Sequence, residues 1–328
     1  MRIIHVREVA NVASTLVEGL QRLGHEAEVR PMRMRRSDGA LEVTGVPSRI
    51  IEASRINRYI RRGRFDVVHI HWAYMGWMAI AGRYPYFLHC HGFDLTRNLK
   101  WPILGWLSRR AVAQARRVFY STPDLKPHAL RLRSDAAFIP NPIKLEVFRP
   151  SEAAHNGRGP RVLMISRFEA KKGPEIAAAV IRQLKSLEPG VQVDAFNWGQ
   201  LTEALVEPGL VNLIPKVPYS EMPSLLNRYD FVVGQFKLGA IGMSELEAMA
   251  CGKPVLCFFN YPQVYDEPPP LLSTRDPVQG AEMLVKLIEN PQLRKETGDK
   301  GRAWVERHHD HIEVARLVEH HYREALGI

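Results

Sequence analysis

The chain has 328 residues, of which 45% are hydrophobic and 24% charged, a composition typical of folded globular proteins and not of disordered ones. This length suits two domains of roughly 150 residues, and no apolar run reaches the roughly 18 residues of a membrane-spanning helix. We expect no signal peptide, because the first predicted strand begins almost at Met1. The cysteines lie in apolar surroundings without metal or disulfide spacing, which indicates buried thiols and a cytoplasmic protein; they are Cys90, Cys251 and Cys257.

The net charge of +10 is concentrated in the first half of the chain. Residues 1–155 hold 25 Lys and Arg against 13 Asp and Glu, whereas residues 156–328 hold 20 against 22. Such an asymmetry predicts that the first half meets an anionic partner. No zinc-finger spacing, RNP-type strand or helix-turn-helix pattern supports nucleic acid, so we expect none. An anionic membrane surface or a phosphate-bearing acceptor fits better.

Apolar runs alternate with helical patterns along the first half, as expected for βαβ units with a parallel sheet. A helix is predicted from about Val12 to Leu23, where Gly24 can end it. The polar, Gly- and Pro-containing run 151–160 is typical of an interdomain linker. The predicted strands are Ile3–Val6, Val67–Ile70, Tyr86–His89 and Val118–Tyr120.

The second half repeats this pattern and ends in a helical tail from about Pro277 to Leu326. We therefore predict an α/β protein with two Rossmann-like domains, residues 1–155 and 156–328. The predicted strands are Val162–Ile165, Val191–Phe196, Val211–Ile214, Phe231–Val233 and Val255–Phe259.

Two cations follow the first strand of the second half. Arg167 stands at the end of the strand, and Lys172 precedes a predicted helix. Such a pair can hold a diphosphate, with the helix dipole adding to the attraction. Taken alone, the same spacing also fits two solvated charges.

A second informative segment runs from Ser244 to Val255 and contains Glu-Ala-Met-Ala-Cys-Gly-Lys-Pro-Val from Glu247 onward. With the earlier Arg-x-x-x-x-Lys-Gly, it resembles the donor-binding half of a GT-B glycosyltransferase, specifically of glycosyltransferase family 4. The resemblance implies two parallel sheets that face each other across a cleft, with an acceptor-binding first domain and a nucleotide-sugar donor-binding second domain. It also implies that the terminal helix, about 312–326, packs back on the first domain.

The resemblance assigns catalytic roles to Arg167 and Lys172, which would stabilise the departing nucleoside diphosphate. Glu247 would accept hydrogen bonds from the nucleotide ribose, since a carboxylate can take two hydroxyl donors. Glu245, two positions earlier, is left without a role.

The chain departs from the family pattern eight positions before Glu247, where Gly239 stands in place of a glutamate. The family's Glu-Gly-Phe-Gly here reads Gly239, Ala240, Ile241 and Gly242, which we include in the donor site because backbone amides can approach phosphate or sugar there. Three interpretations stay open: Gln235 or Lys237 substitutes for the carboxylate, the donor sugar is unusual, or activity is low.

Two further positions are candidates for contact with the nucleotide base: Trp198 stands where the family usually has a Gly-rich turn, and Val217 opens a segment that resembles the loop bordering the base. For both, an ordinary turn between strand and helix explains the sequence equally well.

The acceptor side is predicted around His91, in a His-Gly-Phe-Asp segment that resembles a family loop and ends in Asp94. A histidine at the carboxyl end of a strand points to the ligand edge of such a sheet, so we expect His91 to be a catalytic residue. It would either hydrogen-bond the transferred sugar or help to stabilise charge. Asp94 is expected to organise the loop. The first strand-to-helix turn lacks the family's double glycine, and Arg7 is the candidate acceptor contact there.

Two His-x-His pairs, His69/His71 and His89/His91, place alternate residues on one strand face and raise a metal hypothesis. The first pair matches a family strand end where no metal is expected, and we predict no metal and no cofactor. His71 is assigned to the acceptor side. The histidines at 308, 309, 311, 320 and 321 are expected at the surface.

The predicted function is therefore a retaining, metal-independent glycosyltransferase of cell-envelope or glycan biosynthesis, with a saccharide, glycolipid or lipid-linked acceptor. The alternatives are a catalytically silent nucleotide-sugar-binding partner subunit and a sugar-nucleotide epimerase. The segment from Trp101 to Arg110 combines aromatic and basic residues, which fits either peripheral contact with an anionic membrane or a packed helix with a solvated basic face.

Overall fold

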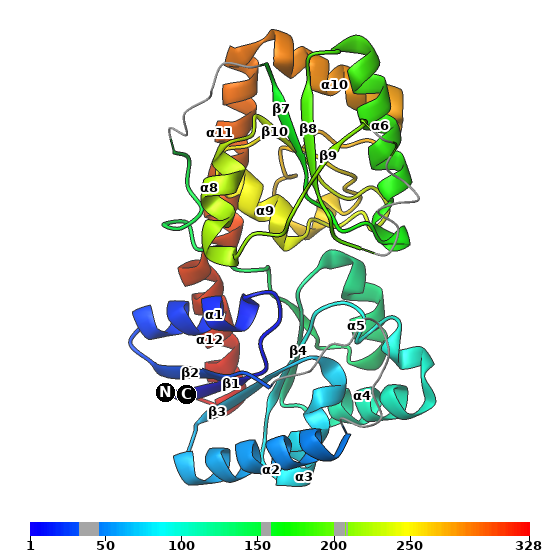
Figure 1. Cartoon of the computed structure of the whole chain (residues 1–328). Coiled ribbons are helices and arrows are strands. Elements are labelled where there is room, and N and C mark those ends of the chain that lie inside the picture. Colours follow the sequence, from blue (N-terminus) through cyan, green and yellow to red (C-terminus); the bar gives the residue numbers. More distant parts are fainter. Residues whose placement is uncertain (33–45, 152–158, 200–206, 208) are drawn as a thin grey trace. The chain divides into compact units, whose positions relative to one another are not determined.

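The computed structural model describes residues 1–32, 46–151, 159–199, 207 and 209–328. These residues form two compact units. The first combines Met1–Pro142 with His311–Ile328, and the second is Ile143–Asp310. Each unit is an α/β domain with its own parallel sheet (Figure 1).

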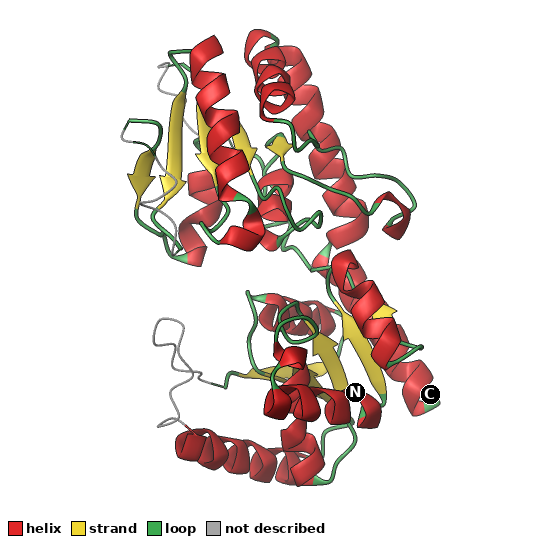
Figure 2. Cartoon of the chain, turned by 90° about the vertical axis from the view of Figure 1, so that its right-hand side faces the viewer, coloured by secondary structure: helices red, strands yellow, loops and turns green. Residues whose placement is uncertain are grey.

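The first unit contains a sheet of parallel strands in the order β2-β1-β3-β4-β5-β6. Helices lie on both faces of this sheet (Figure 2). The strands are β1 (Arg2–Val6), β2 (Glu26–Arg30), β3 (Val67–His71), β4 (Phe87–Cys90), β5 (Arg117–Tyr120) and β6 (Ala137–Phe138). The helices are α1 (Val12–Arg22), α2 (Val46–Gly63), α3 (Trp77–Gly82), α4 (Pro102–Gln114), α5 (Lys126–Leu132) and α12 (His311–Leu326).

Side chains alternate between the two faces of this sheet because successive strand residues point in opposite directions. One face carries aliphatic residues such as Ile4, Val68 and Leu88, which pack into an apolar core. On the opposite face β3 carries His69 and His71, both fully buried. Tyr322 of α12 reaches this second face, which α12 therefore helps to cover.

The second unit contains a parallel sheet in the order β11-β10-β7-β8-β9. Alternate residues of β7 pack into two separate hydrophobic cores, with Leu163 in one and Val162 in the other. The strands are β7 (Arg161–Met164), β8 (Gln192–Phe196), β9 (Asn212–Ile214), β10 (Phe231–Val233) and β11 (Val255–Leu256). The helices are α6 (Pro174–Leu187), α8 (Met222–Asn227), α9 (Met243–Ala250), α10 (Pro277–Glu289) and α11 (Pro291–His309).

The predicted architecture of two α/β domains, each with a parallel sheet, is confirmed, and every strand predicted from the sequence is present. The observed ends differ from the predicted ends by at most one residue, except that the last strand stops at Leu256 and not at Phe259. Helix α1 ends as predicted, with Gly24 at φ 87°. Strands β2 and β6 were not predicted.

The division between the units differs from the predicted boundary at residues 155 and 156. It falls between Pro142 and Ile143, because Ile143 and Phe148 are buried in the core of the second unit. The Ile143 amide also donates to the His309 carbonyl at 2.7 Å. Most of the expected linker, residues 152–158, lies outside the described residues, and Ser151 already donates to Asn227 of the second unit.

The expectation that the C-terminal histidines are exposed is wrong for two of them. His309 and His311 are both buried, since they stand where the chain passes from α11 into α12 and both helices pack against cores.

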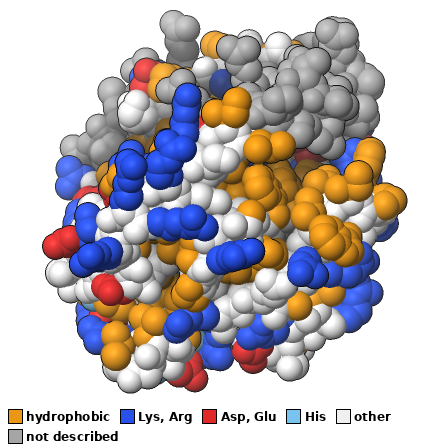
Figure 3. Space-filling view, turned by 90° about the horizontal axis from the view of Figure 1, so that it is seen from below, with side chains coloured by type: hydrophobic (Ala, Val, Ile, Leu, Met, Phe, Trp, Pro, Cys, Tyr) orange, Lys and Arg blue, Asp and Glu red, His pale blue; other side chains and the backbone are white. Residues whose placement is uncertain are grey.

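Helix α4 exposes large apolar side chains near its start. Trp101, Ile103 and Trp106 have exposed fractions of 51%, 74% and 58%, and the Arg110 guanidinium lies 5.7 Å from the Trp106 ring centroid. Figure 3 shows hydrophobic side chains interspersed with Lys and Arg on this face of the first unit. Among the described residues, no helix is long and apolar enough to cross a membrane.

Candidate functional site

The two predicted phosphate-binding cations lie after the carboxyl end of β7. Arg167 follows the strand, and Lys172 ends the short 3-10 helix η5 (Ala170–Lys172). Gly173 then turns the chain with φ 73°, and Pro174 opens α6 at a position where a missing N–H costs nothing. The Lys172 carbonyl accepts from the Phe236 amide at 2.8 Å, which ties this loop to the segment after β10.

Arg167 is held by two neighbours. Its guanidinium pairs with the Glu169 carboxylate at 3.1 Å and lies 4.8 Å from the ring centroid of Trp198. Beneath Arg167 and Lys172 is a cavity of about 10 Å³, room for about one water molecule. The loop thus places two cations at one edge of the sheet, of which Arg167 is held by its neighbours.

Glu245, which had no role in the sequence analysis, is part of this site. Glu245 is 3% exposed, and its carboxylate accepts from the Ser166 hydroxyl at 3.3 Å and from the backbone amide of Gln235 at 3.2 Å. A Cβ atom at Gly234 or Gly242 would lie 2.7 Å from a Glu245 oxygen, so both glycines make room for this carboxylate.

The same Cβ position at Gly242 lies 3.9 Å from the Lys172 ammonium nitrogen. The structure therefore brings Lys172, Gly242 and Glu245 together. The acidic residue in the first turn of α9 and the glycine before that helix are the sequence signals for this arrangement.

Glu247 lies in helix α9 and is 4% exposed. The pKa of its carboxyl group is raised to about 8, mainly by burial; a hydrogen bond with the Tyr219 side chain opposes this shift and the nearby Glu245 charge adds to it. Without a ligand, Glu247 is therefore mainly a neutral acid at pH 7.

The loop from Gly239 to Gly242 is organised by Gln235. The Gln235 side-chain amide donates to the carbonyls of Ala240 and Phe258 at 2.8 Å each, and its oxygen accepts from the Leu238 amide at 2.8 Å. Because these bonds occupy the amide, Gln235 is not available to replace the missing carboxylate.

Lys237 is also engaged, because it forms an ion pair with Glu175. Gly239 itself has φ 70°, and a Cβ there would approach Asn260 and Phe258 to 3.3 Å. A glutamate at position 239 would therefore be strained in this backbone.

The remaining donor-side candidates have mixed surroundings. Trp198 is half-buried and carries the Lys216 ammonium 4.6 Å from its ring centroid, in addition to Arg167. Val217 is half-buried against the core of the second unit. Ala240 and Ile241 are buried, so only their backbone can face a ligand.

In the first unit, Asp94 holds the loop that follows β4. Its buried carboxylate accepts from the amides of Ala73, His91, Gly92 and Leu95 at 2.8–3.1 Å. Burial raises the pKa of Asp94, and these hydrogen bonds together with the Arg7 charge oppose the shift. The backbone around His91 is thus fixed by one side chain.

Arg7 lies at the turn that follows β1, with its guanidinium 4.6 Å from the Trp72 ring centroid. Its charge acts on both Asp94 and His91, so the structure brings three of the predicted acceptor-side residues together. Arg7 and Trp72 have positive φ values, 75° and 89°. Strained backbone of this kind is concentrated at functional sites.

Glu8 is a further residue that the sequence analysis missed. Its carboxylate accepts from the amides of Val9, Ala13 and Ser14 at 2.9–3.1 Å, which caps the N-terminus of α1. The chain therefore supplies its own anion at a helix end that could otherwise bind a ligand anion.

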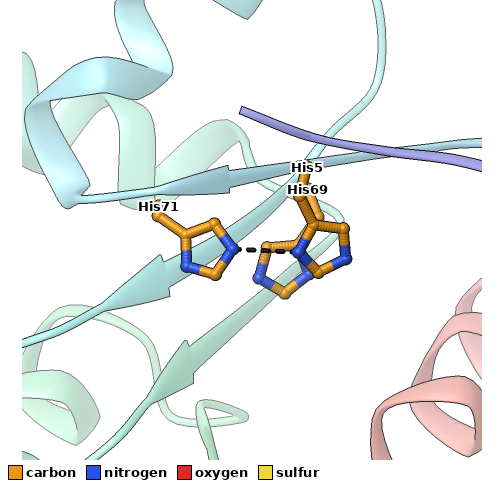
Figure 4. Close-up of side chains that lie close together, drawn as sticks. All are labelled: His5, His69 and His71. Atoms are coloured by element: carbon orange, nitrogen blue, oxygen red, sulfur yellow. Dashed lines mark hydrogen bonds between the residues drawn. The ribbon is translucent and has the colours of Figure 1, made fainter. Parts of the chain in front are cut away.

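His91 is the half-buried end of a cluster of five histidines, and the other four lie on the buried face of the sheet. The cluster consists of His5, His69, His71, His89 and His91. Figure 4 shows three of them converging, with a hydrogen bond of 3.0 Å between His5 Nδ1 and His71 Nε2. Burial is the largest influence on each and lowers all their pKa values, to about 3 for His5 and His89 and well below the usual value for the others. The rings are therefore neutral at physiological pH. Two sets of three rings in this cluster each bring one nitrogen per ring within 4.8 Å of the other two. The sets are His5, His69 and His71, and His71, His89 and His91.

Comparison with known proteins identifies the class. The model of "Glycosyltransferase Family 4" matches residues 9–147, and that of "Glycosyl transferases group 1" matches residues 148–304. The chain is a GT-B glycosyltransferase. Within that class it belongs to the family 4 type.

A curated relative, the D-inositol 3-phosphate glycosyltransferase of Frankia alni, is 26% identical over 81% of this chain and 75% of its own length. Two solved structures share the fold. Sucrose-phosphate synthase from Thermosynechococcus elongatus has a TM-score of 0.76 at 16% identity, covering 100% of both chains. Anabaena Alr3699/HepE in complex with UDP-glucose has a TM-score of 0.74 at 14% identity, covering 99% of this chain and 100% of the other.

Proposed function

We propose that this glycosyltransferase moves a sugar from a nucleotide-sugar donor to a hydroxyl acceptor with retention of anomeric configuration and without a metal. The observation that carries the proposal is the pair of cations after β7, Arg167 and Lys172, beside the α9 segment that contains Glu247. Two side-chain cations can offset the charge of a leaving diphosphate, which is the role that a metal has in other transferases.

In the proposed reaction the bond between the anomeric carbon and the diphosphate oxygen breaks while the acceptor oxygen attacks from the same face. The acceptor hydroxyl proton passes to the departing phosphate, so the protein need not supply a separate base. Arg167 would exchange its ion pair with Glu169 for the phosphate, and Glu247 would accept hydroxyl donors from the ribose.

A phosphate-bearing or membrane-borne acceptor fits the charge of the first half of the chain. Arg7 lies beside His91 and provides a cation on the acceptor side. The name of the Frankia alni relative contains inositol 3-phosphate, and a phosphate-bearing acceptor would agree with that name.

The exposed aromatic residues of α4 support peripheral contact with an anionic membrane at its cytoplasmic face. Trp106 and Arg110 combine an apolar surface with a cation, as interfacial segments do. Co-sedimentation with anionic vesicles, weakened in Trp106→Ala and absent with neutral vesicles, is the expected result. Equal binding to both kinds of vesicle, or to neither, would contradict this part of the proposal.

One observation favours a second candidate, a catalytically silent subunit that binds nucleotide sugars. The family's first glutamate is replaced by Gly239 in a conformation that suits glycine, and the neighbouring Gln235 and Lys237 are engaged elsewhere. Donor turnover in the presence of acceptor separates this candidate from an enzyme.

The first test is a thermal-shift screen against nucleoside diphosphates and their sugars. A ligand at 100 times its dissociation constant adds about 2.7 kcal/mol to the free energy of unfolding. We expect one diphosphate to stabilise the protein and Arg167→Ala to abolish the effect. A well-folded protein that no nucleotide stabilises would contradict both candidates.

The second test is turnover in Lys172→Ala. Removal of one charge-stabilising donor costs about 2–4 kcal/mol of transition-state stabilisation, or roughly 30- to 1,000-fold in rate. Lys171→Ala is the matched control, because this neighbouring lysine pairs with Glu169 at 3.4 Å. Equal rates for the two variants would remove the catalytic assignment of Lys172. If the unmodified protein binds the donor but does not turn it over, the silent subunit is favoured.

A further inference from the structure

The histidine cluster of the first unit and Tyr322 of α12 form one continuous chain of hydrogen bonds. From the accessible end, His91 Nε2 meets His71 Nδ1 at 2.8 Å, and His71 Nε2 meets His5 Nδ1 at 3.0 Å. His5 Nε2 then meets the Tyr322 hydroxyl at 3.2 Å.

The same hydroxyl continues the chain toward its buried end. It bonds to His69 Nδ1, and His69 Nε2 meets His89 Nδ1 at 3.3 Å. His89 Nε2 is buried and has no hydrogen-bond partner among the described residues. The chain therefore runs from half-buried His91 to fully buried His89 and passes through Tyr322.

Proton positions along this chain depend on one another. Each neutral ring has one N–H and one lone pair, and each link requires one donor and one acceptor. Once the Tyr322 hydroxyl donates to one of its two histidines, the tautomer of every ring follows. A third arrangement, in which the hydroxyl accepts from both rings, leaves a fully buried O–H unpaired and is costly.

The two remaining arrangements differ at the ends of the chain. If Tyr322 donates to His69, His89 carries its proton on the unpartnered Nε2, deep in the core. If Tyr322 donates to His5, Nε2 of His89 carries no proton. His91 then carries an N–H on Nδ1, where water or a ligand can accept it. Buried N–H groups without partners are rarer than buried acceptors without partners, so the second arrangement is favoured.

We infer that Tyr322 is a positioning residue that holds His91 in its Nδ1–H tautomer, so that His91 offers an N–H donor, not a lone pair, to a ligand oxygen. The naming of that ligand as a sugar hydroxyl or phosphate rests on the proposed function. The tautomer itself is a property of the folded chain and can be measured without turnover.

The experiment is nitrogen NMR of the full chain with labelled histidine, with the His91 signals identified by His91→Gln. In the unmodified protein we expect His91 to be protonated on Nδ1 and not on Nε2. Tyr322→Phe keeps the ring but removes the hydroxyl, and it should abolish the single tautomer of His91. Near-ultraviolet circular dichroism checks that this variant is folded.

His69→Phe is the matched control. It cuts the chain on the other side of Tyr322 and leaves His5 as the only acceptor for the hydroxyl, so His91 should keep its Nδ1–H tautomer. A proton on Nε2 of His91 in the unmodified protein would overturn the inference, as would an unchanged His91 in Tyr322→Phe. Stoichiometric Zn²⁺ uptake that His71→Gln abolishes would also overturn it, because a metal takes lone pairs that the chain uses.

Discussion

At the scale of single residues, Glu247 combines a carboxyl group with nearly complete burial. Its folded-state pKa of about 8 exceeds the value of 4.5 expected when unfolded, so the folded state retains a proton that the unfolded state releases between these values. The free energy of unfolding should therefore fall as pH rises through this window, by up to roughly 1.4 kcal/mol per pH unit.

Glu247→Gln tests this directly, because the amide keeps the shape of the acid and does not ionise. We expect urea unfolding of the variant to show a shallower pH dependence between about pH 5 and pH 8, and the variant to be more stable than the unmodified protein at higher pH. Glu289→Gln, at an exposed position, is the matched control for the substitution itself. Parallel profiles for unmodified protein and Glu247→Gln would show that the carboxyl is already ionised.

Residues also differ in how far the sequence reveals them. The pairs His69/His71 and His89/His91 were each predicted to share one face of their own strand, because alternation within a strand is a local property. Tyr322 could not be assigned to them, since it lies 253 positions from His69. Glu245 was missed for a related reason: only the folded structure shows that Gly234 and Gly242 leave room for its carboxylate.

At the scale of elements, the sequence predicts the central strands of the first sheet better than its edge strands. Strands β1, β3 and β4 each have a neighbouring strand on both sides. Their sequences are apolar runs or alternate regularly between aliphatic residues and histidine. Strands β2 and β6 stand at the two edges of their sheet. Strand β2 contains Glu26, Glu28 and Arg30, and β6 has only two residues, so neither gives an apolar run.

The start of α1 gives the prediction at this scale. Glu8 accepts from the Ala13 and Ser14 amides, which the first turn of the helix leaves unpaired, and from the Val9 amide just before the helix. Glu8→Ala should lower the free energy of unfolding by about 1–3 kcal/mol in urea titrations. Glu26→Ala removes an exposed ion pair with Arg2 and should change it by less than about 0.5 kcal/mol. Equal effects would mean that solvent caps α1 as well as Glu8 does.

At the scale of the whole molecule, the chain leaves the first unit at Pro142 and returns to it at His311. The returning helix α12 buries Val314, Val318 and Tyr322. Burial of each such side chain is worth about 1.5–3 kcal/mol, and the sum is comparable to the roughly 5–15 kcal/mol that stabilises a domain. The first unit should therefore depend on a segment that lies far away in the sequence.

Fragments test this dependence. Residues 1–142 alone should show no cooperative thermal transition, and addition of a peptide of residues 311–328 should restore one. Residues 143–310 form a continuous unit with its own cores and should unfold cooperatively without either partner. The latter fragment should also bind the nucleoside diphosphate that stabilises the full chain, because Arg167, Lys172 and Glu247 all lie within it. Cooperative unfolding of residues 1–142 without the peptide would show that α12 covers a unit that is already stable, and would restrict the role of Tyr322 to the ordering of the histidine chain.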